Sequence, residues 1–435
     1  MIRFTAKHQT RFKNAARLSL PAFGMLSLLV LSMAIPSTVF AASDNPPGFI
    51  ETLDKLELTP EQRELAMAQK KWAKKLMVGA TQEEINGLTA LTKNPGRVKF
   101  ACMAPIGTTW AKYIREVPKT FRKRVGDVMQ VDAYIGLSLG NDPDYVRKLA
   151  TGALEAAAIT TWGMKYVSKE IGVYELPFLF DTYGEADYVI EKTWPYFVEK
   201  FKDKGFVLVP TNFEVGFLQM FSTNAIIKTP KDLKGTKYAS WMEDVEVTTL
   251  KHFDVNPVVI TVMEIPSSLA TGIIQTASAP TMYMIGAQLM SFIGKGGGCS
   301  GVNMFYPPAG LVYMKKNIFN ATLTNVPKNK RKYITKYIDQ AYSLFDDLLK
   351  EIAPQLAAEL REGNKKLLGD LQKKGMKLYI PTEEERANWK QATRPIWDKL
   401  AGKVYSQEIL DMILKAKSDY RAAHPEEFEN YVWVP

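Results

Sequence analysis

The pattern of hydrophobic and polar residues predicts alternating strands and helices from about residue 98 onward. Three apolar, strand-like runs alternate with two helical segments, in the order 98–103, 111–125, 128–134, 142–151 and 156–160. Strands that alternate with helices in this way pair in parallel and form an α/β lobe. Ligands of such sheets bind where the strands end. We therefore expect a candidate site at residues 103–110 and 160–162.

A second set of elements lies between residues 229 and 280. Thr229 and Pro230 form a helix-start signal, because a capping hydroxyl precedes a ring whose fixed φ suits the first helical position. The run VVITV (258–262) is continuous and β-branched, which favours a strand covered on both faces. A short helix over 264–271 follows. This region predicts a second lobe.

The remaining elements are helical. The segment 327–361 carries apolar residues at helical spacing, and Thr382 with Glu385 starts a further helix. Near the amino end, Thr81 and Glu84 have the spacing of a capping box, which predicts a helix to about residue 93. The extension 42–96 is either a packing appendage on one lobe or a docking surface for a partner.

The first 41 residues have the features of a secretory signal peptide. Residues 1–17 contain five basic residues and no acid, residues 18–36 are largely apolar, and a small-x-small site ends at Ala41. Cleavage near Ala41 places the mature chain in the periplasm. Its net charge then falls from +10 to about +5. The alternative is an uncleaved membrane anchor, but Pro21, Gly24 and Pro36 interrupt the apolar run.

Patterns of catalytic chemistry are missing from the sequence. It has no zinc-ligand spacing, CxxC, HExxH or G-x-S-x-G motif, and the glycine-rich run 294–301 lacks the Gly-Lys-Ser/Thr order of a phosphate loop. Basic runs lie on predicted helices without interleaved aromatic residues, which argues against nucleic-acid binding. We predict no enzyme, no cofactor and no metal site. The two cysteines, Cys102 and Cys299, leave a disulfide open.

Several motifs resemble one known family, the solute-binding proteins of tripartite ATP-independent periplasmic (TRAP) transporters, of the dicarboxylate-binding type. The matching motifs are Glu-Leu-Pro-Phe-Leu-Phe at 175–180, Asp-Leu-Lys-Gly at 232–235, Asn-Pro at 256–257 and Glu-Ile-Pro-Ser-Ser-Leu-Ala-Thr-Gly-Ile-Ile-Gln at 264–275. They occur in the family's order, and the resemblance extends from about Val98 to the final helix.

The resemblance implies a two-lobed, Venus-flytrap α/β fold with crossing hinge strands and long C-terminal helices. Lobe I then comprises 97–213 and 305–435, and lobe II comprises 214–304. It also implies capture of a small molecule by lobe closure and its delivery to integral-membrane transporter subunits. A protein that kept the fold but serves as an interaction module is a further alternative.

The family's substrate clamp is altered in this chain. Ala239 occupies the position of the arginine that holds the ligand carboxylate, and a second arginine position falls at about Gln219. Aromatic and apolar residues in segments expected to face the cleft suit an aromatic or alicyclic acid or a lipid-like ligand. Lys165, Lys237 or hydroxyl groups could still hold a carboxylate, so a small organic acid remains the alternative.

The candidate ligand-binding residues combine the family positions with these apolar side chains. Each aromatic or methionine side chain can instead belong to the core. Glu214 can accept hydrogen bonds from a ligand or pair with a nearby lysine. The full set is Met103, Trp110, Trp162, Glu214, Phe217, Gln219, Ala239, Trp241, Met242, Pro280 and Tyr283.

Overall fold

The computed structural model describes residues 80–125, 128–294 and 296–429, all of which belong to one compact unit. A first sheet has the strand order β2-β1-β3-β10-β4. Its strands are β1 (Arg97–Cys102), β2 (Gln130–Ile135), β3 (Ala156–Thr160), β4 (Val207–Phe213) and β10 (Ala309–Tyr313). Strand β1 pairs in parallel with both β2 and β3, as the alternating pattern predicts, whereas β10 is antiparallel to β3 and β4.

A second sheet has the order β11-β9-β5-β8-β6-β7. Its strands are β5 (Leu218–Ser222), β6 (Tyr238–Ser240), β7 (Val258–Val259), β8 (Thr276–Pro280), β9 (Gly298–Ser300) and β11 (Leu378–Tyr379). The chain passes from the first sheet to the second after β4 and returns between β9 and β10. Strand β11 comes from the C-terminal part, so this short segment departs from the expected division, in which 305–435 all lie in lobe I.

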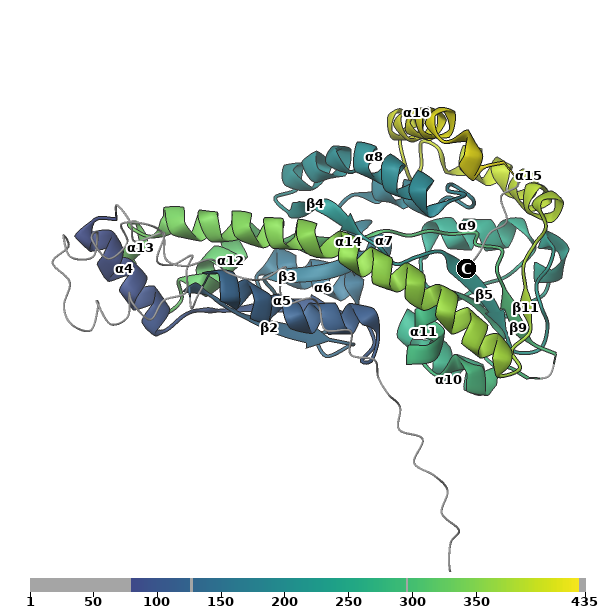
Figure 1. Cartoon of the computed structure of the whole chain (residues 1–435), viewed down its shortest axis with the longest axis horizontal. Helices are drawn as coiled ribbons and strands as arrows, with labels where there is room; N and C mark the ends of the chain where they lie inside the picture. Colours follow the sequence, from purple (N-terminus) through teal and green to yellow (C-terminus); the bar gives the residue numbers. More distant parts are fainter. Residues whose placement is uncertain (1–79, 126–127, 295, 430–435) are drawn as a thin grey trace, which may run out of the picture. The chain divides into compact units, whose positions relative to one another are not determined.

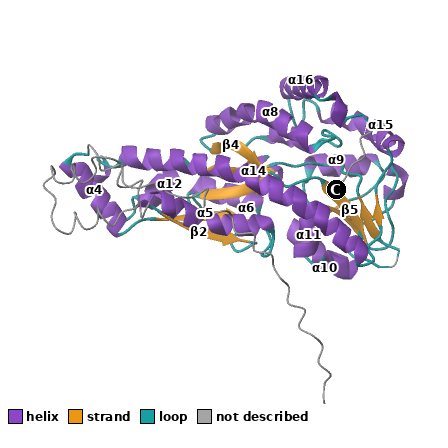
Figure 2. Cartoon of the chain, viewed as in Figure 1, coloured by secondary structure: helices purple, strands orange, loops and turns teal. Residues whose placement is uncertain are grey.

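Helices cover the faces of both sheets (Figure 2). Around the first sheet lie α4 (Gln82–Lys93), α5 (Thr109–Val125), α6 (Asp142–Thr151), α7 (Thr161–Met164), α8 (Tyr183–Asp203), α12 (Lys315–Thr322) and α13 (Lys328–Arg331). With the second sheet go α9 (Asp244–His252), α10 (Ile265–Ala270) and α11 (Thr281–Gly286), and the chain ends in α14 (Thr335–Lys373), α15 (Glu383–Leu400) and α16 (Gln407–Ala423). The two-lobed α/β fold with long C-terminal helices is therefore confirmed.

Helix α14 joins the two lobes along its length. Its 39 residues contact α5 and β4 of the first lobe and α11 of the second (Figure 1). A helix of this length rises by about 1.5 Å per residue, so it is long enough to run past both sheets. Residues of α14 can thus reach the space between the lobes.

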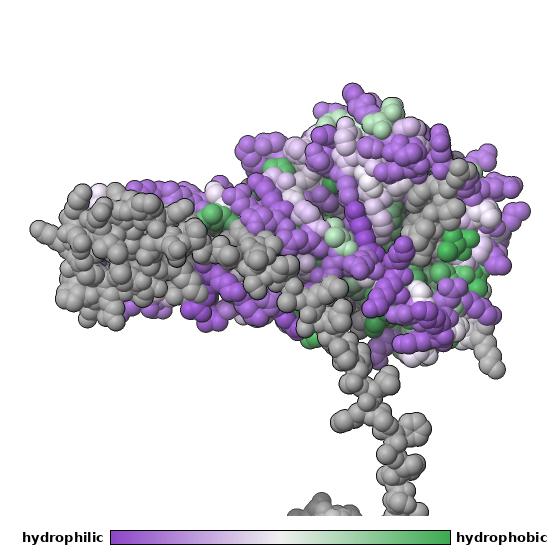
Figure 3. Space-filling model, in the orientation of Figure 1, coloured by the Kyte–Doolittle hydropathy of each residue, from purple (hydrophilic) through white to green (hydrophobic). Residues whose placement is uncertain are grey.

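Polar side chains cover most of the visible surface of the described residues (Figure 3). The face in Figure 3 is mostly hydrophilic with separate hydrophobic spots, and the large exposed apolar side chains, such as Ile106 and Val259, are scattered along the chain. Within the described part of the chain, no helix has the length and apolar character needed to span a membrane.

Cys102 and Cys299 are both buried and free, so they form no disulfide. The expected signal peptide lies outside the described residues.

Candidate functional site

A pocket lies between the two sheets, at the carboxyl ends of their strands. It contains about 730 Å³ of space outside protein atoms, including the part open to solvent. Its lining comes from the end of β1 and the following loop, the end of β3, the start of α6, the crossing segment after β4, and the residues that follow β6 and β8. Parallel strands bring these ends to one edge, which is where the sequence predicts the site.

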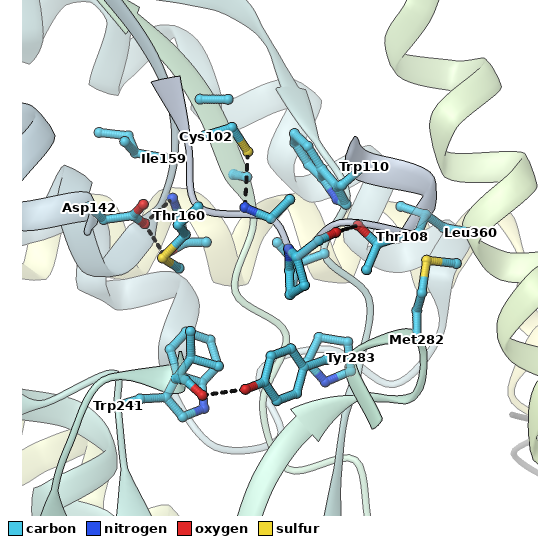
Figure 4. A pocket seen from close by; sticks show the side chains of 18 residues that line it. Cys102, Thr108, Trp110, Asp142, Ile159, Thr160, Trp241, Met282, Tyr283 and Leu360 are labelled. Atoms are coloured by element: carbon cyan, nitrogen blue, oxygen red, sulfur yellow. Dashed lines mark hydrogen bonds between the residues drawn. The ribbon is translucent and has the colours of Figure 1, made fainter. Parts of the chain in front are cut away.

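Five of the sequence-predicted site residues line this pocket. They are Met103, Trp110, Trp241, Pro280 and Tyr283. The polar atoms of the three rings are bonded within the protein, because Trp110 Nε1 donates to the Glu214 carbonyl (2.8 Å), Trp241 Nε1 donates to the Ser278 carbonyl (2.7 Å), and the Tyr283 hydroxyl donates to the Val262 carbonyl. These hydrogen bonds orient the rings. Figure 4 shows the three rings around the pocket, with the bond of the Tyr283 hydroxyl drawn as a dashed line.

Asp142 is the ionisable carboxylate in this lining. It opens α6, where Asn141 provides the helix cap, and its Oδ2 accepts from the Thr160 N–H (2.7 Å) and hydroxyl (2.8 Å). Burial raises the pKa of Asp142 to about 7, although the bonds from Thr160 oppose this shift. Cys102, also in the lining, has its pKa raised to about 12 by burial, so it is a neutral thiol.

Glu214 does not line the pocket, but it supports the lining. Its carboxylate is 2% exposed and accepts from Arg361 Nε at 2.7 Å, so its partner is an arginine rather than the lysine considered from sequence. Arg361 also bonds Asp187 in a bidentate manner. Burial lowers the pKa of Arg361, but its bonds to Asp187 and the charge of Glu214 raise it above its usual value. The carbonyl of Glu214 holds Trp110.

The other predicted site residues lie beside the pocket rather than in its lining. Phe217 packs against Tyr183 and Tyr306, with ring centroids 5.0 and 4.8 Å away. Gln219 donates to Asn303 Oδ1 (3.1 Å) and accepts from the Thr281 hydroxyl (2.6 Å). The Phe217 ring therefore packs within the protein, and the Gln219 amide is hydrogen-bonded within the protein.

Ala239, Met242 and Trp162 are also outside the lining. Ala239 is buried in β6 and pairs with Ala277 and Val258 across the sheet. Met242 is buried without exposed area, and Trp162 is buried with an Nε1 atom that has no partner among the described residues. The sequence predicts that Ala239 lies in a strand and that Trp162 follows a strand, but it does not predict the direction of either side chain.

Neither lysine that could replace the missing arginine reaches the pocket. Lys165 Nζ lies 2.7 Å from Glu175 Oε2, with both side chains buried. Lys237 is on the surface, where it donates to the Gly272 carbonyl at 3.2 Å. Among the described residues that line the pocket, none is lysine or arginine.

The remaining lining residues were not named individually as candidate site residues, although Ala104, Pro105, Thr108 and Thr160 lie within the predicted ranges 103–110 and 160–162. These remaining residues are Cys102, Ala104, Pro105, Thr108, Asp142, Ala158, Ile159, Thr160, Val215, Val262, Met282, Ala309 and Leu360. Those near 103–110 and 160 belong to the strand ends marked by the pattern, and Asp142 could have been found as an acid at the start of the helix after β2. Leu360 carries no such signal, because only the fold brings α14 to the pocket.

Contacts between the lobes close around the pocket. The Thr109 N–H lies 3.2 Å from Met282 Sδ, and Lys165 Nζ donates to the Met242 carbonyl. Gly286 packs closely on Thr108, since a Cβ added to Gly286 would lie 3.0 Å from Thr108 Cγ2. The pocket is therefore bounded by both lobes in this structure.

Comparisons with known proteins agree with this architecture. Over 77% of this chain and 95% of the relative, the chain is 21% identical to the C4-dicarboxylate-binding periplasmic protein DctP of Rhodobacter capsulatus. A match to the uncharacterized protein YiiZ of Salmonella typhimurium, 26% identical, covers 36% of this chain, and the chain spans about half of that relative (48%).

A solved structure shows the same fold. The sugar acid binding protein DctPAm from Advenella mimigardefordensis, in complex with galactonate, superposes with a TM-score of 0.64 and 21% identity, over 75% of this chain and 98% of that one. Residues 100–293 and 329–403 match the family described as bacterial extracellular solute-binding protein, family 7. The chain therefore belongs to this family of solute-binding proteins, as its resemblance to the TRAP binding proteins predicts.

Proposed function

We propose that this protein is exported to the periplasm with cleavage near Ala41, captures a substantially apolar ligand by lobe closure, and delivers it to integral-membrane transporter subunits. The ligand is an aromatic or alicyclic acid or a lipid-like molecule. The pocket between the lobes and the contacts across its mouth support capture by closure. The periplasmic location of the relative named DctP supports the compartment.

One observation carries the ligand class: the described lining contains aromatic rings, methionines and aliphatic side chains but no lysine or arginine. Burying a carboxylate without a cation or several donors costs several kcal/mol, roughly, because its hydration is lost. Apolar area, by contrast, contributes about 25 cal/mol per Å² when it leaves water. The ligand's binding energy therefore comes mainly from its apolar surface.

A small organic acid is the alternative, and the relatives favour it. One relative is named for C4-dicarboxylates, and the Advenella protein holds galactonate. In this chain such a ligand would depend on backbone N–H groups and hydroxyls. The third possibility, a binding fold that serves only as an interaction module, is less well supported, because a pocket that is partly open to solvent remains between the lobes.

The experiment is to purify the mature protein from a native-like host, denature it and identify any released small molecule by mass spectrometry. A hydrophobic or ring-bearing compound supports the proposal, and a small dicarboxylate or sugar acid overturns it. Trp241→Ala removes a lining ring and should reduce retention of the compound. Leu414→Ala, at an exposed position on α16, serves as the control and should not.

A further inference from the structure

The indole and hydroxyl donors in the described lining of the pocket are bonded to acceptors of the protein. Five lining groups donate hydrogen bonds to other groups of the protein. They are the indoles of Trp110 and Trp241 and the hydroxyls of Tyr283, Thr108 and Thr160. A ligand that needs a hydrogen-bond donor from a side chain finds these groups already bonded. The polar match between the side chains of the pocket and a ligand therefore depends on side-chain acceptors in the lining that have no hydrogen-bond donor within the protein.

Among the described lining residues, Asp142 carries a buried carboxyl oxygen without a hydrogen-bond partner. Asp142 is completely buried, and its Oδ2 takes both bonds from Thr160. Its other oxygen, Oδ1, has no hydrogen-bond partner among the described residues. In Figure 4 the carboxyl group of Asp142 points from α6 toward Thr160 and the pocket interior. A buried carboxylate oxygen without a donor is costly, and a ligand group can remove that cost.

We propose that Asp142 Oδ1 accepts a hydrogen bond from a neutral hydroxyl of the ligand, so that the ligand is an apolar ring or chain bearing an alcohol or phenol group. This inference rests on the proposed function and deepens it. A hydroxyl can also accept a bond, so it matches Asp142 in both its ionised and its protonated form. A ligand carboxylate at the same place would meet a second carboxyl group with no cation in the lining.

The structural role of Asp142 does not account for this oxygen. Oδ2 alone ties the start of α6 to the end of β3 through Thr160. Gly163 also fixes the position of the residue, since a Cβ there would lie 2.7 Å from Asp142 Cβ. These contacts involve Oδ2 and Cβ, and Oδ1 is left without a partner among the described residues.

The test compares three probes that share one apolar body: 4-phenylbutan-1-ol, its methyl ether and 4-phenylbutyrate. Binding is followed through tryptophan fluorescence, since Trp110 and Trp241 line the pocket. At pH 8 the alcohol should bind the wild type at least about tenfold more tightly than the ether, which cannot donate. In Asp142→Asn the amide oxygen can keep the bonds from Thr160, and the NH₂ group takes the place of Oδ1. Since an NH₂ group can donate to the oxygen of either probe, the ratio of the affinities for the alcohol and the ether should fall to near one.

A second measurement needs no variant. At pH 5 a protonated Asp142 can donate to the ether oxygen, so the preference of the wild type for the alcohol should shrink. The neighbouring ionisable groups, Cys102 and Tyr145, stay neutral between pH 5 and 8 because burial raises the pKa of each. Melting temperatures and circular dichroism report whether Asp142→Asn is folded.

The outcomes separate this inference from the proposed function. Equal binding of the alcohol and the ether by the wild type at pH 8, or a preference unchanged in Asp142→Asn, overturns the role of Asp142 and leaves the apolar pocket standing. Binding of 4-phenylbutyrate alone overturns this inference but agrees with an aromatic acid as the ligand. Binding of none of the probes overturns the proposed ligand class and this inference with it.

Discussion

Arg361 Nε, on the long helix α14, lies 2.7 Å from Glu214 Oε2, on the segment that crosses from the first sheet to the second. The carbonyl of the same Glu214 accepts from the indole of Trp110, which lines the pocket. A single residue of the crossing segment thus connects the long helix to the binding site. Leu360, the neighbour of Arg361, reaches the pocket directly.

Arg361→Met leaves Glu214 buried without its cation. Since Glu214 is 2% exposed, we expect the free energy of unfolding to fall by about 3 kcal/mol, the typical cost of removing one partner of a buried pair. Urea denaturation measures this change. Arg97→Met removes an exposed arginine bonded to Asp132 and is the matched control. Equal effects of the two substitutions would show that Glu214 tolerates the loss of its partner.

Glu246→Gln should change the pH dependence of stability. Burial raises the pKa of Glu246 to about 7, against 4.5 in the unfolded chain, while its Oε2 accepts from the Trp241 and Met242 N–H groups. Between these values the folded state holds a proton that the unfolded chain releases. The free energy of unfolding therefore falls as the pH rises through this window.

Glutamine cannot titrate, so the variant escapes this loss. From pH 5 to pH 8 the stability of Glu246→Gln relative to wild type should improve by about 2–3 kcal/mol, at about 1.4 kcal/mol per pH unit. Denaturant curves of both proteins across this range provide the measurement. Parallel pH profiles would mean that Glu246 is ionised throughout. Glu175, whose charge also raises the pKa of Glu246, is present in both proteins.

Local signals in the sequence predict local structure well. Thr81 and Glu84 predict a capping box, and the structure has both of its bonds at the start of α4. The strand expected over 258–262 is shorter, because Thr261 and Glu264 form another capping box that turns the chain after Val259. Here a cap wins over the strand preference of β-branched residues.

The binding site is only partly predictable, because side-chain direction depends on tertiary packing. Trp110 and Trp162 both follow a strand of the first sheet, but Trp110 lines the pocket and Trp162 does not. No local signal marks Leu360, which lies about 250 residues from Trp110 in the sequence and lines the same pocket only because of the course of α14. Ala239 illustrates the same limit, since losing an arginine does not show what replaces it.

Gly286→Val should hold the lobes apart. A Cβ added at Gly286 would lie 3.0 Å from Thr108 Cγ2, so valine must displace either the Thr108 side chain or α11, and we expect α11 to move away from the loop after β1. The radius of gyration from X-ray scattering should rise, and affinity for the co-purified compound should weaken by at least about tenfold, or roughly 1.4 kcal/mol.

Two controls make this prediction specific. Gly369→Val, on α14 with open space around its Cα, should leave both quantities unchanged. Thr108→Ser removes the clashing methyl group and should partly restore affinity to Gly286→Val. If Gly286→Val kept the radius of gyration and the ligand affinity of the wild type, the close contact between Gly286 and Thr108 would not be needed for closure.

Cys102 can report opening of the pocket directly. Cys102 lines the pocket and is 5% exposed. Burial raises the pKa of its thiol to about 12. At pH 8 the reactive thiolate fraction of Cys102 is therefore roughly a thousandfold lower than that of a free cysteine. The variant Cys299→Ala keeps only Cys102, and we expect it to react slowly with a maleimide. The reaction should be faster when Gly286→Val is added. It should be slower than in Cys299→Ala alone when ligand is bound to that variant. Cys102→Ala, which keeps the fully buried Cys299 of β9, should stay unreactive in all three conditions. If ligand and Gly286→Val leave the labelling rate of Cys102 unchanged, the lobes do not control access to the pocket.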